Sequence, residues 1–321
     1  PWKLFFKIAL PLSRPAILVG VALALMEAAN DVGAVEFFGL KTLTSLIYTV
    51  WLNRASLVTA SQIACLFLFV ILLVLWCERY ARQTQRLYQS GGKSTPAMRL
   101  RLTGGAAFAA FCLCLLPIAL GFVVPVMMLL GSALAHVEQD KLNMLVYPIL
   151  NALYLAGCAT ALTVTIGCLF AYLSHQWPRS IVSFFIRLTT LGYAVPGVVL
   201  AVGILIPLAA FDNALDYALR ENFGLSTGLL LSGTSVAIIY AYAIRFLPMA
   251  YGSCDSAFQR LSPNFAFAAR TLGRSETAVL REISLPLLRP ALVTSAILVF
   301  VDGMKELPAT LLLRPFNFDT L

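Results

Sequence analysis

The feature that most constrains this chain is a series of long apolar stretches that carry few charged residues. Hydrophobic residues make up 60% of its 321 residues, charged residues make up only 12%, and the mean hydropathy is +0.86. A soluble domain is closer to half apolar and a quarter charged. The composition therefore excludes a soluble enzyme, a disordered chain and an ordinary nucleic-acid-binding protein, and it indicates a protein embedded in a lipid bilayer.

Seven stretches are long enough to cross a bilayer, which requires about 20 mostly apolar residues in a helix. The expected spans are 15–35, 57–77, 103–131, 148–173, 181–209, 227–250 and 291–312. The predicted fold class is therefore an all-α polytopic membrane protein with about seven transmembrane helices in this chain.

The basic residues indicate how the spans are oriented. The formal net charge is +8, and 17 of the 23 Lys and Arg residues fall in or beside four alternate segments, 1–14, 78–102, 174–187 and 245–290. Cytoplasmic segments of membrane proteins carry such an excess. We therefore place these four segments on the inside, with Arg245 at the inner end of a span, and the polar stretch 210–226 at the outer surface.

Two distant parts of the sequence repeat each other. Residues 8–17 read IALPLSRPAI and residues 283–292 read ISLPLLRPAL, which gives seven identities in ten at an offset of 275. The two copies are six spans apart, so both run in the same direction, which indicates two halves related by an axis along the membrane normal. We expect residues 1–77 to end a first six-helix half, 78–102 to be a cytoplasmic linker, and 103–321 to be a second half that is truncated before its last helix.

The inside segment that follows the sixth span predicts two short helices with a sharp bend between them. Ser262-Pro263 is a typical helix start, Gly273 is a typical stop, and Ser275 is suited to begin a second helix that ends before Pro286. One face of the first helix is expected to carry Phe265, Ala268, Ala269 and Leu272. The residues alone are equally consistent with a helix on the lipid headgroups and with one that docks on a partner protein.

The spacing in this segment resembles the cytoplasmic loop of bacterial ABC-importer permeases, whose pattern is EAA, three residues, Gly, nine residues, Ile, one residue, Leu-Pro. The matching positions are Ala268, Ala269, Gly273, Ile283, Leu285 and Pro286. The end of a second copy is matched by Ile8, Leu10 and Pro11, and its Gly would precede Pro1, so we expect the chain to be a fragment. Phe267 stands where the pattern has Glu. The resemblance implies that the loop docks in a groove of a dimer of cytoplasmic ATPase subunits and transmits their closure.

Two further strings resemble the ferric-iron permeases in which both halves are fused in one chain. They are GYAVPG at 192–197 and DGMKELPATLLLRPFNFDTL at 302–321. The resemblance implies the type I ABC-importer permease fold, a place in the bacterial inner membrane, and a periplasmic binding protein that delivers ferric iron. It also implies that the chain is not an enzyme and binds no cofactor, since a separate subunit would use the ATP.

Two alternatives to ferric-iron transport stay open. Permeases for thiamine, polyamines and phosphonates are close relatives, so the same kind of machine could carry one of these. An ATP-independent secondary transporter or channel is a different class of protein, but it has no use for an ATPase-docking helix pair. The string GGKST at 91–95 has Leu87 in place of the first Gly of a phosphate loop, so we expect no ATP site here.

Four acidic residues stand inside or at the ends of expected spans. Glu27 and Asp31 are four residues apart on one helix, and the repeat aligns them with Asp302 and Glu306. Acidic groups inside a membrane are costly and usually functional. The repeat places both pairs in the outer half of the membrane, where a pathway for a hard, oxygen-preferring cation would run. A purely structural role, with Lys305 and helix ends as partners, is the alternative, and we assign no metal ligands.

The span 181–209 contains Pro196-Gly197 near its middle. Proline removes a helical hydrogen bond and glycine adds backbone freedom, so we expect a kink or a break there. Broken helices inside the membrane mark substrate sites in many transporters, although a packing kink explains the residues equally well. Tyr193 is the nearest candidate pathway residue, together with Pro196 and Gly197.

Overall fold

A computed structural model describes the chain at residues 2–54, 56–83, 102–135, 139–177, 181–189, 192–315 and 318–320, and these residues are helical or loop with no strand. The all-α prediction is confirmed over this part of the chain. By its internal contacts the chain divides into two units, Pro1–Gln85 with Leu150–Leu321, and Arg86–Ile149. Most of the expected linker 78–102, including the string at 91–95, lies outside the described residues.

The second unit is built from two helices joined by one wide turn, α6 (Gly105–Ile118), the π-helix η2 (Ala119–Val123) and α7 (Val124–Ala135), and from the beginning of α8 (Gln139–Gln176). The stretch Gly105–Ala135 is strongly apolar, and its side chains are mostly exposed among the residues that the structure describes. An apolar helix satisfies its backbone hydrogen bonds internally and is stable in lipid, which is the environment expected for this stretch.

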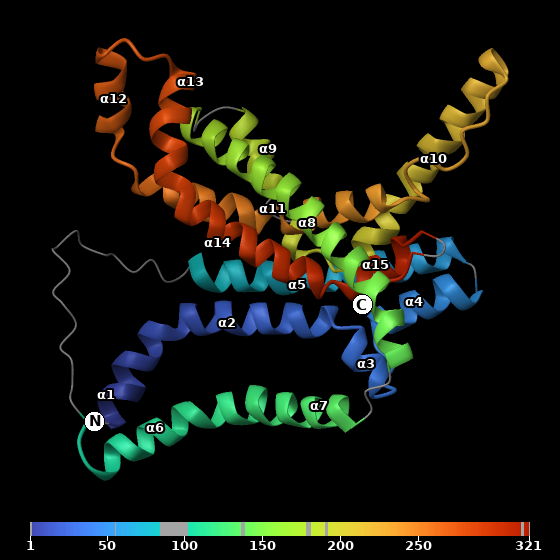
Figure 1. Cartoon of the computed structure of the whole chain (residues 1–321). Coiled ribbons are helices and arrows are strands. Elements are labelled where there is room, and N and C mark those ends of the chain that lie inside the picture. The colour runs from blue at the N-terminus through green and yellow to red at the C-terminus, as the bar shows by residue number, and fades with distance from the viewer. Residues whose placement is uncertain are drawn as a thin grey trace. The chain divides into compact units, whose positions relative to one another are not determined.

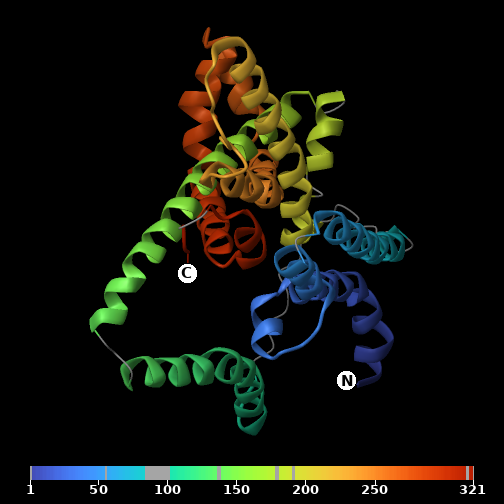
Figure 2. The ribbon, with the colours of Figure 1, turned by 90° about the vertical axis from the view of Figure 1, so that its right-hand side faces the viewer.

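The first unit contains the remaining helices, which Figures 1 and 2 show in two orientations. Its elements are α1 (Trp2–Leu4), η1 (Phe5–Ala9), α2 (Leu10–Asn30), α3 (Gly33–Phe37), α4 (Leu43–Arg54), α5 (Leu57–Gln83), the rest of α8, α9 (Ile181–Thr189), η3 (Gly192–Ala194), α10 (Gly197–Phe223), α11 (Ser235–Arg260), α12 (Pro263–Thr271), α13 (Glu276–Val279), η4 (Leu280–Ser284), α14 (Leu285–Met304) and α15 (Leu307–Leu313).

Helix α11 is the central element of the first unit and is the most buried of the candidate spans. It lies beside α14 in both views and contributes Ile238, Ala241 and Phe246 to the core. A side chain at Gly167 of α8 would collide with Ala250 of α11, so the absence of a side chain lets these backbones approach closely. Small residues at such contacts are the usual means of helix association in membranes.

Six helical stretches among the described residues are long and apolar enough to cross a membrane, and they correspond to six of the seven expected spans. The remaining expected span, 15–35, falls on α2, whose side chains are described only in part. Several predicted boundaries are wrong. The span 181–209 is divided between α9 and α10, and the span 291–312 is interrupted after Met304.

The placement of Arg245 at the inner end of a span is also wrong. Helix α11 runs on to Arg260, so Arg245 lies well inside it. Apolar residues flank this charge on both sides in the sequence, and a carboxylate from another segment, that of Glu306, pairs with the arginine. A charge that has such a partner is tolerated within a span.

The internal repeat is present in the backbone as well as in the sequence. At the offset of 275, η1 corresponds to η4, the first residues of α2 and α14 coincide, and both helices break before a short helix, α3 or α15. The wide π-turns have a local cause. Pro11 and Pro286 have no N–H to donate and their rings crowd the carbonyl four residues earlier, so Leu10 and Leu285 donate five residues back instead.

Candidate functional site

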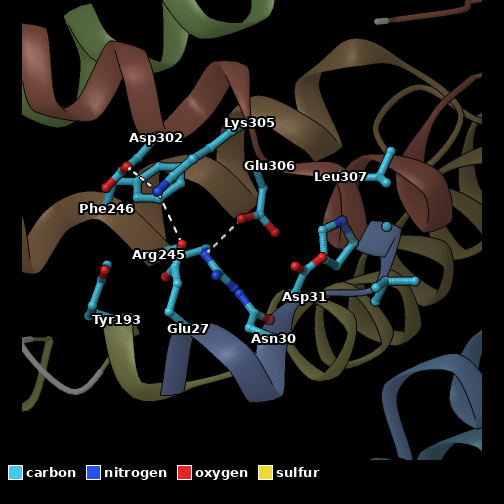
Figure 3. Close-up of a pocket in the computed structure, with 13 residues that line it drawn as sticks. Glu27, Asn30, Asp31, Tyr193, Arg245, Phe246, Asp302, Lys305, Glu306 and Leu307 are labelled. Atoms are coloured by element: carbon cyan, nitrogen blue, oxygen red, sulfur yellow. Dashed lines mark hydrogen bonds and ion pairs between the residues drawn. The ribbon is translucent and has the colours of Figure 1, made fainter. Parts of the chain in front are cut away.

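The candidate pathway residues meet where the two repeated helices break. A cavity of about 340 Å³ lies there, and Figure 3 shows the side chains that line it. Its charged residues are Glu27, Asp31, Arg245, Asp302, Lys305 and Glu306, and Tyr193 also reaches it. The structure therefore brings together all four acidic residues that the sequence singled out, although the two pairs are almost the whole chain apart.

Lys305 joins the two repeated helices through their equivalent carboxylates. Its Nζ lies 3.0 Å from Oε1 of Glu27 on α2 and 3.0 Å from Oδ1 of Asp302 on α14. Figure 3 shows the ammonium between the two acids. The repeat aligned Glu27 with Asp302, but it did not predict that a single cation would contact both.

A second ion pair, between Arg245 and Glu306, is buried. Nε of Arg245 lies 3.1 Å from Oε2 of Glu306, and both side chains are only 6% exposed. Nη1 of the arginine donates to the carbonyl of Val195 at 3.3 Å, and its guanidinium lies 5.8 Å from the ring centre of Phe246. Removing either member of such a pair leaves a buried charge without a partner, so each residue stabilises the position of the other.

The Pro196-Gly197 string forms a break between helices. Pro196 caps the start of α10, and the backbone N–H of Gly197 donates to Oδ1 of Asn30 at 2.9 Å. A Cβ on Gly197 would overlap Oε1 of Glu306 and crowd Nη1 of Arg245. Glycine is required here because the buried ion pair approaches the backbone. Of the string 192–197, Tyr193 lines the cavity, whereas Gly197 lies behind it, against the side chains of Glu306 and Arg245.

The acids of each pair have different local roles. Oδ1 of Asp31 accepts the N–H of Ala34 at 3.0 Å, and Oε1 of Glu306 accepts the N–H of Ala309 at 3.4 Å. These equivalent acids therefore cap the short helices α3 and α15, as helix N-termini favour. Glu27 and Asp302 do not cap a helix, and both contact the ammonium of Lys305 instead. The four-residue spacing in the sequence groups Glu27 with Asp31 and Asp302 with Glu306. The contacts in the structure group Glu27 with Asp302.

Arg245 and Asn30 are site residues that the sequence reasoning missed. A lone arginine with apolar residues on both sides was a usable signal, but its charge was read as the end of a span. Asn30 precedes Asp31 and aligns with Lys305 in the repeat, so the repeat itself could have identified it. Among the described residues, no group of three or more His, Cys, Asp or Glu side chains is arranged to hold a metal ion.

The inside loop has the predicted two-helix form. Ser262 caps α12 by accepting the N–H of Asn264, and Ser275 caps α13 by accepting the N–H of Ala278. Gly273 has a φ of +79°, the left-handed conformation that glycine adopts without strain. Two exposed ion pairs cross the bend, Arg270 with Glu276 at 3.0 Å and Arg274 with Glu282 at 3.4 Å.

The four residues expected on one face of the first inside-loop helix, the last of which directly follows α12, differ in exposure. Ala269 is buried, whereas Ala268 is exposed together with Phe265, Phe267 and Leu272. Phe267, which stands in place of the motif Glu, also borders a cavity of about 230 Å³ that includes His175 of α8. The surface that α12 offers is therefore apolar and aromatic where the motif would place a charge.

The remaining motif residues lie where the loop joins the spanning helices. Ile283 is in η4, and Leu285 and Pro286 begin α14. In the other copy Ile8 is in η1, and Leu10 and Pro11 begin α2. Each copy of the motif thus ends at an equivalent π-turn, η1 or η4, which joins the loop to the long helix that follows.

Curated proteins similar to this chain are named as permeases. The Fe(3+)-transport system permease protein FbpB 2 of Haemophilus influenzae is 26% identical over 317 residues, 97% of this chain and 59% of the relative. The ferric transport system permease protein FbpB of Actinobacillus pleuropneumoniae is 28% identical over 51% of this chain and 22% of its own length. A putative 2-aminoethylphosphonate transport system permease protein PhnV of Salmonella typhi is 25% identical over 54% of this chain and 60% of its own length.

The chain spans about 59% of the length of the Haemophilus influenzae relative. A family model described as "Binding-protein-dependent transport system inner membrane component" matches residues 1–86 and 163–315. These two stretches contain the repeated helices, the inside loop and all the charged residues of the cavity. With its helical spans, its loop motif and this match, the chain belongs to the family of binding-protein-dependent transport system inner membrane components.

Proposed function

We propose that this chain is the membrane-spanning permease of a bacterial ABC importer that moves ferric iron into the cytoplasm. A periplasmic binding protein would deliver the ion, and a separate pair of ATPase subunits would hydrolyse ATP. The observation that carries the proposal is the bent α12–α13 loop, whose motif residues are continuous with a helix that ends at an acid-lined cavity. The relatives named as ferric permeases support the choice of cargo.

The helix that joins the loop to the cavity suggests how the two sites communicate. From Glu276 to Met304 the chain is helical without a break, through α13, η4 and α14. At about 1.5 Å per residue, this length corresponds to about 44 Å, enough to connect the cytoplasmic surface to the outer half of the membrane. A docked ATPase that moves α12 would shift or turn this helix and so change the contacts of Asp302 and Lys305.

The charge of the cavity supports a cationic cargo. Four carboxylates face two cationic side chains, which leaves a net charge of −2 in the cavity. Ferric iron is a hard cation that prefers oxygen ligands. The relatives named for 2-aminoethylphosphonate make a phosphonate the second candidate, but its anionic group would be repelled by the net charge of this cavity.

The test uses the full transporter, reconstituted in proteoliposomes with its ATPase subunits and an iron-loaded binding protein. We expect uptake of radioactive iron that requires ATP. Gly273→Asp should abolish that uptake and the stimulation of ATP hydrolysis by the binding protein, because Asp strains the bend on which α12 depends. Insertion into the membrane should be unchanged.

The matched control is Gly39→Asp, in the turn between α3 and α4. Gly39 has a φ of +67° and open space around its Cα, so the substitution imposes the same backbone strain outside the inside loop. Uptake should persist in this variant. Uptake without ATP, or normal coupling in Gly273→Asp, would contradict the proposed function.

A further inference from the structure

The cavity already holds a cation, the ammonium of Lys305. It lies 3.0 Å from a carboxylate oxygen of Glu27 and 3.0 Å from one of Asp302, which come from segments 275 residues apart. Figure 3 shows the Lys305 side chain reaching the space between them. The two acids are the equivalent positions of the repeat, so the ammonium occupies the point where both halves offer the same ligand.

The fold does not require a charge at the position of Lys305. The equivalent residue in the first copy is Asn30, whose side-chain oxygen accepts the N–H of Gly197 and brings no cation to the cavity. Both residues stand where a long helix breaks before a short one. The positive charge is therefore a property of one copy only, and a neutral side chain is compatible with the same backbone.

The ion pairs of Lys305 and the ion pair of Arg245 differ in how easily they separate. The side chains of Lys305, Glu27 and Asp302 are 56%, 57% and 15% exposed, whereas those of Arg245 and Glu306 are 6% exposed. An exposed ion pair adds little stability because water replaces each partner, while a buried pair cannot be separated without stranding a charge. Arg245 is thus a fixed part of the wall, and Lys305 is able to leave its carboxylates.

We propose that Lys305 determines the specificity of the pathway as a tethered competitor for Glu27 and Asp302. Between transport cycles its ammonium occupies this carboxylate pair and excludes monovalent cations, which bring the same single charge but lack the high local concentration of a tethered group. A trivalent cation interacts about three times more strongly with the same two carboxylates and displaces the ammonium. The proposal rests on the proposed function, since it assumes a multivalent cation as cargo.

The experiment compares Lys305→Asn with the native residue in the reconstituted full transporter. Asn is chosen because the repeat places it at the equivalent position. Iron uptake is measured in rising sodium chloride, with N-methylglucamine chloride keeping the ionic strength constant. In Lys305→Asn the sodium concentration that halves uptake should fall about tenfold or more, as expected for loss of a tethered competitor. A passive leak of radioactive sodium should also appear in the absence of ATP.

Two controls isolate the role of the charge at this position. Lys305→Arg keeps a tethered cation and should keep the native resistance to sodium. Lys41→Asn removes an exposed lysine away from the cavity and should leave both uptake and leak unchanged. Resistance to sodium that is lost equally in Lys305→Arg and Lys305→Asn would show a structural role and overturn the proposal.

The outcomes separate this inference from the proposed function. If the native transporter shows no ATP-dependent iron uptake, the proposed function is wrong. A native transporter that imports iron, with a Lys305→Asn variant that stays resistant to sodium and free of leak, overturns the inference alone. If Lys305→Asn and Lys305→Gln both fail to reach the membrane, the Lys305→Arg variant tests the proposal instead. Lys305→Arg retains the positive charge, so a loss of sodium resistance in this variant would contradict the proposal.

Discussion

The two copies of the repeat, residues 5–37 and 280–312, have the same backbone conformation but differ in the burial and pairing of their charged side chains. Each begins with a π-turn, continues as a long helix, breaks after about twenty residues and ends in a short helix capped by an acid. In the second copy the capping acid, Glu306, is buried against Arg245, whereas in the first copy Asp31 is exposed to the cavity. The same local fold therefore supports a fixed buried ion pair in one copy and an exposed carboxylate in the other.

The largest expected effect comes from removing the buried carboxylate. Glu306→Gln should lower the stability of the protein by about 3–5 kcal/mol, because Arg245 would remain buried without a counter-charge. The measurement is thermal unfolding in detergent, together with the yield of folded protein. A variant as stable as the native chain would show that water reaches Arg245 and that the two copies do not differ in this way.

The second largest loss of stability is expected at Gly197, whose backbone lies against the buried ion pair. Gly197→Ala should cost about 1–3 kcal/mol, since its methyl group would displace the Glu306 carboxylate and the Arg245 guanidinium. The matched control is Gly203→Ala in the same helix, where the added methyl meets open space and should be neutral or slightly stabilising. Equal stability of the two variants would contradict the close approach of Glu306 to α10.

The smallest effect should come from the exposed acid of the first copy. Asp31→Ala removes the acceptor of the Ala34 N–H and should cost about 1 kcal/mol or less, because α3 is short and the carboxylate is exposed. Asp31→Asn keeps an oxygen acceptor and should recover most of that loss. A loss in Asp31→Ala as large as that in Glu306→Gln would mean that the two copies are energetically equivalent.

Much of the architecture could be predicted from local patterns. The apolar stretches locate the helices, the repeat at an offset of 275 recurs in the backbone, and Ser262, Gly273 and Ser275 form the bend that the sequence indicates. These features are local because caps, turns and proline effects act within a few residues. The break at Pro196-Gly197 was foreseen for the same reason, but its contact with Glu306 was not.

The candidate site could be predicted only in part. The four acids were found because charge is costly in lipid, yet grouping them by helical spacing missed the contact of Glu27 and Asp302 with one ammonium. Arg245 was placed at a membrane surface because a single sequence shows a charge without its partner. The partner, Glu306, is 61 residues away on another helix, and only packing brings the two together.

The sequence by itself determined that this chain is a bundle of membrane helices with a repeated segment and a bent inside loop, because hydropathy, caps and glycine conformations act over short distances. The tertiary structure decided which charges are fixed and which are exchangeable. The reason is that the energy of an ion pair depends on its burial, and burial is set by helices that are distant in the sequence and adjacent only in the fold.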